Sequence, residues 1–182
     1  MTPELETKRL ILRPLELADA TQIQEIFAQW EVVKYLNASV PWPYPADGAL
    51  SYCRDVAIPG MERGEEWYWT LRLKSAPGGV IGIISLARNE HANRGFWLDP
   101  KWQMQGLMTE ACDAVTDYWF EVLKFPVLRA PKAIANKGSR RISEEQGMRI
   151  VWSGEREYVS GKLPSEIWEI TTEEWRARKK HQ

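Results

Sequence analysis

The sequence predicts a single α/β (α+β) domain in which a mixed, mostly antiparallel sheet is flanked by helices. Segments of alternating apolar residues, such as 67–73 and 79–87, are interspersed with segments of helical periodicity, such as 107–123. The chain has 182 residues, of which 44% are hydrophobic, enough for one domain with a sizeable core. No internal repeat or linker divides the chain, so we expect residues 1–182 to form one domain.

Charge and cysteine content argue against several classes of function. Lys and Arg total 24 against 25 Asp and Glu, which disfavours a nucleic-acid-binding or membrane-surface protein. The 2 cysteines and 2 histidines lie far apart, without the spacing of a zinc site or a disulfide framework. Acidic residues precede a short apolar run at the N-terminus, unlike a signal peptide. We therefore expect a cytoplasmic protein without a metal.

The N-terminal elements are one strand and two helices. Residues 9–15 alternate enough in polarity to be a strand. Residues 17–30 repeat apolar side chains at helical spacing, and Asp19 is placed to cap this helix. After a proline-rich loop, a proline and an aspartate begin a second helix, which we expect over 45–58.

Three strands and a long helix form the middle of the chain. Residues 67–73 and 79–87 are predicted strands, joined by a tight turn at 77–79. A short strand at 94–99 ends at a proline. Residues 107–123 place seven apolar side chains on one face, which predicts a helix that covers the sheet.

The C-terminal part returns to strands around one short helix. Residues 127–134 are a strand of moderate signal. The helix at 136–147 begins near an asparagine and ends at a glycine. Residues 148–154 and 165–175 are predicted to be closing strands.

The junction between the strand at 94–99 and the helix at 107–123 is a candidate anion site. It reads "WQMQGLMTEA" at 102–111, and Gly106 would let a ligand approach the backbone closely. The N–H groups of the first helical turn and the helix dipole favour an anion there. The loop is neither a Walker loop nor a GxGxxG motif, so a plain turn remains the alternative.

Asn136 and Ser139 add a second polar element at the start of the last predicted helix. They would either contact a polar ligand or cap their own helix. With these segments in order, the chain resembles the GNAT superfamily of acyl-CoA-dependent N-acetyltransferases, and within it the branch of ribosomal-protein alanine N-acetyltransferases. The segments that carry the resemblance span nearly the whole chain and are "LETKRLILRPLELAD", "VPWPYPADGALSYC", "GVIGIISL", "GFWLDPKWQMQGLMTEA", "ANKGSRRISEEQGM" and "IWEITTEEW".

The resemblance implies an enzyme that transfers an acetyl group from acetyl-CoA to a primary amine by direct attack. The amine would belong to a protein N-terminus or a small molecule, and the protein would be a monomer or a homodimer. A splayed strand pair would form the acyl-CoA cleft. Two alternatives stay open: a CoA-binding module that has lost catalysis, and a protein-interaction module on the same scaffold.

The resemblance also implies which residues hold coenzyme A. The family's pyrophosphate loop corresponds to Gln103, Met104, Gln105, Gly106, Leu107 and Met108. Met108 departs from the family pattern, which has a small residue there, and is expected to crowd the loop or tilt the helix. Backbone groups of Phe96, Trp97 and Leu98 would pair with the pantetheine arm. Asn136 and Ser139 would lie near the thioester, and Arg140 would reach a phosphate or be simply solvated.

Amide formation needs a base for the amine and a proton for the leaving thiolate. Glu90 or His91 is the candidate base, with a solvated turn as the alternative for both, and Ser139 is the candidate acid. The family's acceptor site would bring together the aromatic residues Trp30, Tyr35, Trp42 and Tyr44, with core and loop anchors as the alternative. Trp67 and Trp69 alternate with Tyr68, so one face of that strand would be buried and the other would line the groove, which adds Trp69 to this aromatic set. Within this set, helical spacing favours a core position for Trp30.

Overall fold

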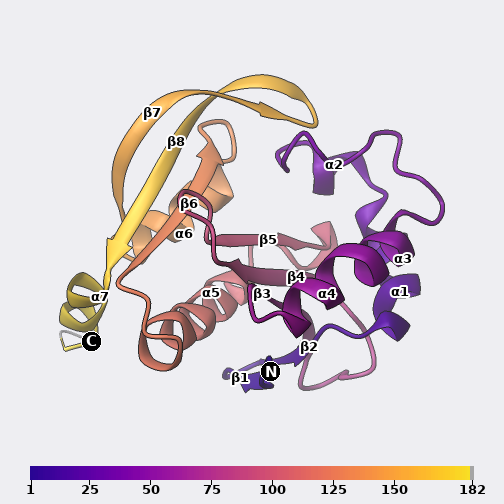
Figure 1. The fold of residues 1–182 in the computed structure, drawn as a ribbon, viewed down its shortest axis with the longest axis horizontal. Helices are drawn as coiled ribbons and strands as arrows, with labels where there is room; N and C mark the ends of the chain where they lie inside the picture. The colour runs from indigo at the N-terminus through magenta and orange to yellow at the C-terminus, as the bar shows by residue number, and fades with distance from the viewer. Residues whose placement is uncertain (181–182) are drawn as a thin grey trace.

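The computed structural model describes residues 1–180 and contains two antiparallel sheets flanked by helices (Figure 1). The first sheet has the order β1-β2-β3-β4-β5, and the second has the order β6-β8-β7. The strands are β1 (Leu5–Glu6), β2 (Leu10–Pro14), β3 (Glu66–Leu73), β4 (Gly82–Ala87), β5 (Arg94–Leu98), β6 (Val127–Ala133), β7 (Arg149–Tyr158) and β8 (Gly161–Thr171). The predicted class of antiparallel strands flanked by helices is confirmed, and residues 181–182 of the predicted domain lie outside the described residues.

Seven α-helices are found among the described residues. They are α1 (Ala20–Phe27), α2 (Trp30–Val33), α3 (Gly48–Tyr52), α4 (Ile58–Glu62), α5 (Leu107–Asp117), α6 (Lys137–Glu145) and α7 (Thr172–Lys179). A π-helical turn at Cys53–Ala57 joins α3 to α4, and another at Tyr118–Val122 extends α5. The predicted helices at 45–58 and 107–123 therefore correspond to continuous helical stretches of similar extent.

Alternation along β3 assigns the two faces of the first sheet to different layers. Trp67, Trp69 and Leu71 belong to the main core, which α5 covers. Tyr68 points to the opposite face and packs with residues of α1 and α3, including Ile23. The helices α1, α3 and α4, which we call the helical layer, therefore cover the face of the first sheet opposite to α5. The candidate site lies on this side of the sheet.

The two sheets separate between β5 and β6. They are joined at one end, where Asn93 N–H donates to the Arg129 carbonyl (2.8 Å) and Arg129 N–H donates to Asn93 Oδ1 (2.7 Å). Beyond this point β6 pairs with β8, and β5 pairs only with β4 among the described strands. One edge of β5 is therefore free of sheet partners, as the predicted splayed strand pair requires.

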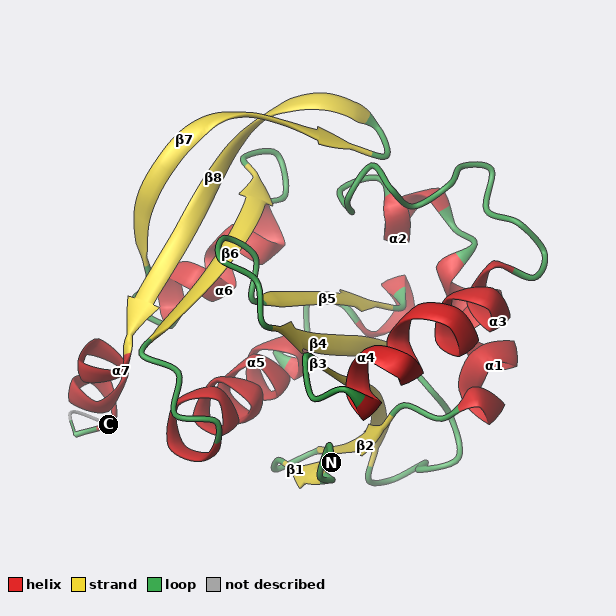
Figure 2. Ribbon diagram, viewed as in Figure 1, coloured by secondary structure: helices red, strands yellow, loops and turns green. Residues whose placement is uncertain are grey.

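The hairpin of β7 and β8 arches over to the loop that follows α2 (Figure 2). Asn37 bridges Tyr158, Val159 N–H donates to the Leu36 carbonyl (3.0 Å), and Ser160 N–H donates to the Lys34 carbonyl (3.2 Å). We call these main-chain contacts the clasp. The sequence prediction left residues 155–164 without a strand, so it missed the hairpin that makes the clasp.

The helix predicted over 17–30 is broken, and its predicted cap has another role. A short 3-10 turn precedes α1, which ends at Phe27, and Gln29 has extended backbone angles before α2. The Asp19 carboxylate accepts from Glu16 N–H (3.0 Å) and from Arg72 Nη2 (2.6 Å). Because Asp19 binds Arg72 of β3, it ties the start of α1 to the sheet instead of capping α1.

The strand predicted over 165–175 ends early. β8 stops at Thr171, whose Oγ1 accepts from Glu174 N–H (3.2 Å), while the Glu174 carboxylate accepts from Thr171 N–H (2.9 Å). This reciprocal pair is a capping box, and it begins α7. The Thr-x-x-Glu spacing at 171–174 was the sequence signal that the strand prediction overlooked.

Candidate active site

A cavity of about 780 Å³ lies where β5, β6, the helical layer and the β7–β8 hairpin meet. Four of the predicted cofactor residues line it, namely Phe96 and Trp97 of β5 together with Asn136 and Ser139 at the start of α6. Tyr158 lines it from the hairpin. Leu98 is buried in the main core instead. This central cavity is therefore bounded on one side by the free edge of β5 and on another by the beginning of α6.

The predicted pyrophosphate loop follows the end of β5 and lies outside the central cavity. Its exposed residues 103–106 precede α5, and Gly106 has φ +77, a conformation that side-chain-bearing residues rarely adopt. Gln103 Nε2 donates to the Leu98 carbonyl (3.0 Å). Arg9 Nη2 donates to the Gln105 carbonyl (2.9 Å). The loop is thus held by hydrogen bonds to β5 and to Arg9, and Gly106 is the N-cap residue of α5.

Met104 and Met108 occupy opposite environments. Met104 is 93% exposed, so its side chain makes no core contact. Met108 is 7% exposed and packs in the main core with Leu107 and Ala111 of α5. The prediction that Met108 crowds the loop is therefore wrong, because its side chain fills the space between α5 and the sheet.

Replacing Met108 with alanine should destabilise the fold by about 2–5 kcal/mol, because the buried side chain leaves a cavity. Chemical unfolding followed by fluorescence measures this free energy. Met104→Ala is the matched control and should change it by less than about 0.5 kcal/mol, since the side chain is exposed. Equal, small effects of the two substitutions would contradict the core assignment of Met108.

Asn136 and Ser139 lie at the start of α6, and the side chain of Lys132 on β6 contacts Ser139. The Asn136 side chain accepts from Ser139 N–H (3.3 Å), as an N-cap. Lys132 Nζ donates to Ser139 Oγ (2.6 Å) and lies 5.2 Å from the centroid of the Phe96 ring. Burial, with a smaller contribution from the nearby Arg94 guanidinium, lowers the pKa of Lys132 to about 7. Sequence reasoning missed Lys132.

Arg140 does not reach into the central cavity. Its Nε donates to Glu166 Oε2 (2.9 Å), and its guanidinium carbon lies 5.8 Å from the centroid of the Trp168 ring. Both partners belong to β8 and are buried. The predicted contact between Arg140 and a phosphate is therefore wrong, because the Arg140 guanidinium binds β8 and so connects α6 to the second sheet.

Phenol and thiol groups from β3, α3 and the segments on either side of α3 also line the central cavity. The Tyr52 and Tyr68 hydroxyls lie 2.8 Å apart, and burial raises the pKa of both. Burial also raises the pKa of Tyr44 to about 12 and that of the Cys53 thiol to about 11. These groups stay protonated near neutral pH, so they offer hydrogen bonds and not a base.

The predicted aromatic acceptor set divides into three groups. Tyr35 and Tyr44 line the central cavity. Trp30 and Trp42 pack against each other with centroids 5.4 Å apart, are each 41% exposed, and do not line the cavity. Trp69 is fully buried and donates its indole N–H to the Pro3 carbonyl (2.6 Å). The core position expected for Trp30 and the acceptor role expected for Trp69 are therefore both wrong.

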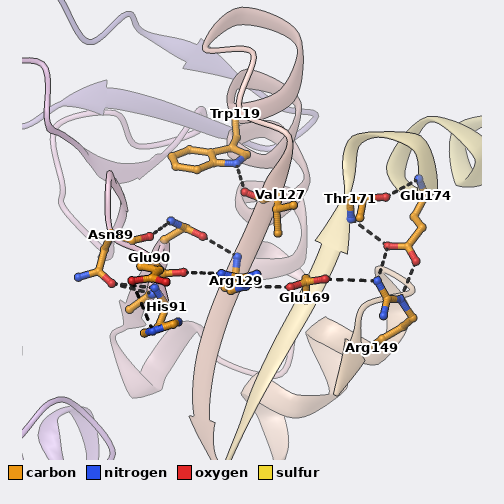
Figure 3. Close-up of polar contacts among 12 residues, drawn as sticks. Asn89, Glu90, His91, Trp119, Val127, Arg129, Arg149, Glu169, Thr171 and Glu174 are labelled. Carbon is orange, nitrogen blue, oxygen red and sulfur yellow. Dashed lines mark hydrogen bonds and ion pairs between the residues drawn. The ribbon is translucent and has the colours of Figure 1, made fainter. Parts of the chain in front are cut away.

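Glu90 and His91 lie in the turn between β4 and β5, next to Arg129 of β6 (Figure 3). Arg129 Nη1 donates to the Glu90 carbonyl (2.8 Å). The Glu90 and His91 side chains are 80% and 59% exposed, and neither residue lines the central cavity. The arrangement favours a solvated turn over a catalytic base for both Glu90 and His91.

Three other carboxylates do line the central cavity. They are Asp47 and Asp55, beside and within the helical layer, and Glu157 of β7. No group of three or more His, Cys, Asp or Glu is placed to hold a metal ion within residues 1–180. Among the same residues, no helix has the length and apolar character needed to cross a bilayer.

Comparison with known proteins places this geometry in a family. Residues 9–149 match the model of the Acetyltransferase (GNAT) domain. The chain is 31% identical over 150 residues to the putative ribosomal N-acetyltransferase YdaF of Bacillus subtilis strain 168, covering 77% of this chain and 78% of the relative. The uncharacterized N-acetyltransferase YoaA of that strain is 30% identical over 149 residues, covering 81% and 83%.

A solved structure has the same fold. Mycobacterium smegmatis RimJ, in complex with CoA-disulfide, superposes with a TM-score of 0.80 at 16% identity, over 98% of each chain. At 16% identity, the similarity to RimJ shows the fold alone. The domain match and the two relatives show the family. The chain therefore belongs to the GNAT family of acetyltransferases and is an acyltransferase with acetyl-CoA as donor.

Proposed function

We propose that the protein acetylates the primary amine of a protein N-terminus or a small molecule, by direct attack of the amine on acetyl-CoA. The observation that carries the proposal is the free edge of β5, which leads from the fixed loop at 103–106 to a cavity lined by Asn136 and Ser139. A strand edge without a partner offers N–H and C=O groups for an amide-containing chain.

The residues present fit coenzyme A. Backbone N–H groups at the start of α5, with Gly106 before them, suit a diphosphate. The free β5 edge at Phe96–Leu98 suits the two amides of a pantetheine arm. Together they form a continuous path from the surface loop to the central cavity.

Acetyl-CoA, when bound, supplies an activated acyl group. This chain's residues then have three tasks in the proposed mechanism. N–H groups on the β5 edge stabilise negative charge on the carbonyl oxygen. Asp47 or Glu157, directly or through water, takes the proton from the incoming ammonium, whereas both oxygens of the third carboxylate, Asp55, are bound by Arg54. Ser139 Oγ–H gives a proton to the departing sulfur.

The acceptor would enter from the side of the helical layer. Tyr35 and Tyr44 provide aromatic surface there, which suits an apolar or cationic amine. The clasp residues Leu36, Asn37 and Tyr158 also line the cavity. The acceptor that we propose is therefore the end of a chain or a small molecule, and not a folded surface. The ribosomal assignment in the name of YdaF fits the N-terminal acceptor.

Acetyl-CoA turnover against a panel of amines tests the proposal. The panel contains peptides with free N-terminal alanine or serine, the same peptides with blocked N-termini, and spermidine. We expect thiol release with at least one free amine and none with the blocked peptides. Binding of acetyl-CoA in calorimetry without turnover on any amine would favour the module that has lost catalysis. No binding at millimolar acetyl-CoA would favour the interaction module and remove the proposed function.

Gly106→Val should weaken acetyl-CoA binding about tenfold, because a β-branched residue at φ +77 forces the loop out of its present backbone conformation. Calorimetric titration of acetyl-CoA measures the affinity. Gly78→Val is the matched control, since a side chain at Gly78 would meet nothing within 4 Å and its φ is ordinary. Unchanged affinity of the Gly106 variant would exclude the loop from the cofactor site.

A further inference from the structure

Lys132 is a buried cation that the proposed mechanism has not yet used. It is 4% exposed on β6, and within residues 1–180 no carboxylate forms an ion pair with it. Glu166 is its cross-strand neighbour on β8, but the Glu166 carboxylate is taken by Arg140 and by the indole N–H of Trp168. The Lys132 ammonium bonds Ser139 Oγ and faces the ring of Phe96.

We propose that Lys132 and Ser139 form a proton relay, in which Lys132 replaces the proton that Ser139 gives to the departing thiolate of coenzyme A. The inference rests on the proposed acetyl transfer and names a further residue for it. Lys132 lines the central cavity beside Ser139, and in the proposed relay it acts through Ser139 as a positioning and proton-supplying residue.

Hydrogen-bond direction supports the relay. An ammonium group has only donors, so Ser139 Oγ must be the acceptor of the 2.6 Å bond from Lys132. No hydrogen bond within residues 1–180 has Ser139 Oγ as its donor, although Ser139 N–H donates to Asn136. The hydroxyl hydrogen is thus left to point toward a ligand, and Ser139 lines the central cavity.

The acidity of Lys132 suits this role. A serine hydroxyl that lost its proton unaided would become an alkoxide, which is a much stronger base than a thiolate. Burial lowers the pKa of Lys132 to about 7, below the value of about 8.5 for an ordinary thiol. Proton transfer from Lys132 through Ser139 to the sulfur is therefore downhill, and no alkoxide accumulates.

Burial is the main reason that the pKa of Lys132 is low, and the charged and titratable groups of the neighbouring elements have smaller effects on it. Arg94 of β5 lies close enough to repel the ammonium, and its own guanidinium is held by Thr116 and Gln146. Cys112 of α5 would raise the pKa of Lys132 only as a thiolate, and full burial raises the pKa of that thiol. On β8 and α6, Glu166 and Arg140 neutralise each other in an ion pair.

The protons balance over one turnover. The acceptor ammonium gives one proton to a cavity carboxylate, which passes it to solvent, before its nitrogen bonds to the carbonyl carbon. The nitrogen loses a second proton to solvent as the amide forms. The carbon–sulfur bond breaks with its electron pair on sulfur. Ser139 gives its hydroxyl proton to the sulfur and receives one from Lys132 Nζ. Lys132 then regains one of the two released protons from solvent, the other stays in solvent, and nothing is oxidised or reduced.

The pH dependence of kcat tests the relay in the full-length enzyme, with acetyl-CoA and whichever amine of the panel gives turnover. A group needed in its protonated form supports activity below its pKa and fails as pH rises through it, so wild-type kcat should fall above about pH 7. Lys132→Met should lower kcat at pH 6.5 about tenfold or more and abolish this falling limb. The KM for acetyl-CoA should change less than about twofold.

Two further variants separate proton supply from structure. Lys132→Arg keeps a donor beside Ser139 but cannot release a proton near neutral pH, so kcat should stay low and lack the falling limb. Lys74→Met is the control at a half-exposed lysine paired with Glu6, and its profile should match the wild type. Unfolding of Lys132→Met should show no loss of stability, because methionine replaces a buried charge that has no carboxylate partner.

The outcomes distinguish the relay from the proposed function. Wild-type turnover with an unchanged falling limb in Lys132→Met, or kcat within twofold of wild type, would overturn the relay and leave the acetyltransferase proposal standing. Full activity of Lys132→Arg would also overturn it, since a hydrogen bond would then suffice. Absence of wild-type turnover would remove the proposed function itself.

Discussion

Ser139→Ala should lower kcat for acetyl transfer about 100-fold or more while leaving the KM for acetyl-CoA nearly unchanged. The variant loses the hydroxyl that faces the central cavity, so the departing sulfur must take its proton from water. Lys132 loses its hydrogen-bond partner at the same time. Steady-state kinetics with the free-amine peptide or spermidine measures both constants, and a pre-steady-state thiol assay shows whether the chemical step is the one that slows.

Ser143→Ala is the control for this experiment, one turn further along α6. Ser143 is fully buried, does not line the central cavity, and its Oγ has no hydrogen-bond partner among residues 1–180. The same substitution there should leave kcat unchanged and should not reduce stability, because it removes an unsatisfied hydroxyl. A Ser139 variant as active as the Ser143 variant would show that Ser139 only begins the helix.

Asp19→Ala should destabilise the fold by about 3–5 kcal/mol, because it leaves the buried Arg72 guanidinium without a countercharge. The two side chains are 4% and 3% exposed and form an ion pair at 2.6 Å. Arg72 keeps only neutral partners, the Thr70 hydroxyl and the carbonyls of Pro77 and Gly78. Urea unfolding at neutral pH measures the loss.

Glu65→Ala supplies the matched comparison at the surface. Its ion pair with Arg63 is 2.7 Å long, but the side chains are 54% and 58% exposed. Solvent screens such a pair, so the loss should stay below about 1 kcal/mol. If Asp19→Ala cost no more than this, the buried pair could not be what fastens α1 to the first sheet.

Local periodicity predicted most of the secondary structure because each signal lies within a few neighbouring residues. The alternation at 67–73 and the helical pattern at 107–123 both correspond to elements of similar extent. The errors came where a distant partner decides the outcome. Asp19 was expected to cap a helix, yet Arg72 of β3 claims its carboxylate. Trp69 alternates with Tyr68, and alternation identifies two faces without saying which one meets α5.

The sequence predicted the parts of the candidate site that depend on backbone motifs. It did not predict the parts that depend on which elements pack together in the folded chain. Gly106 and Asn136 stand at helix starts, which sequence can identify. Lys132 was missed because its importance comes from Ser139, reached only when β6 packs against α6. Glu90 was expected near the amine because it precedes β5 in sequence, but Arg129 binds the Glu90 carbonyl and the Glu90 side chain is exposed outside the central cavity.

The clasp bears on how acceptor specificity can change over evolutionary time. It is built from main-chain groups of the α2 loop and the β7–β8 hairpin, through the Asn37–Tyr158 bridge and the bond from Val159 N–H to the Leu36 carbonyl. Main-chain bonds form with almost any side chain. Mutations could therefore remodel the side chains of both segments that line the central cavity, and so change its shape and polarity, while the main-chain connection between the two segments persists.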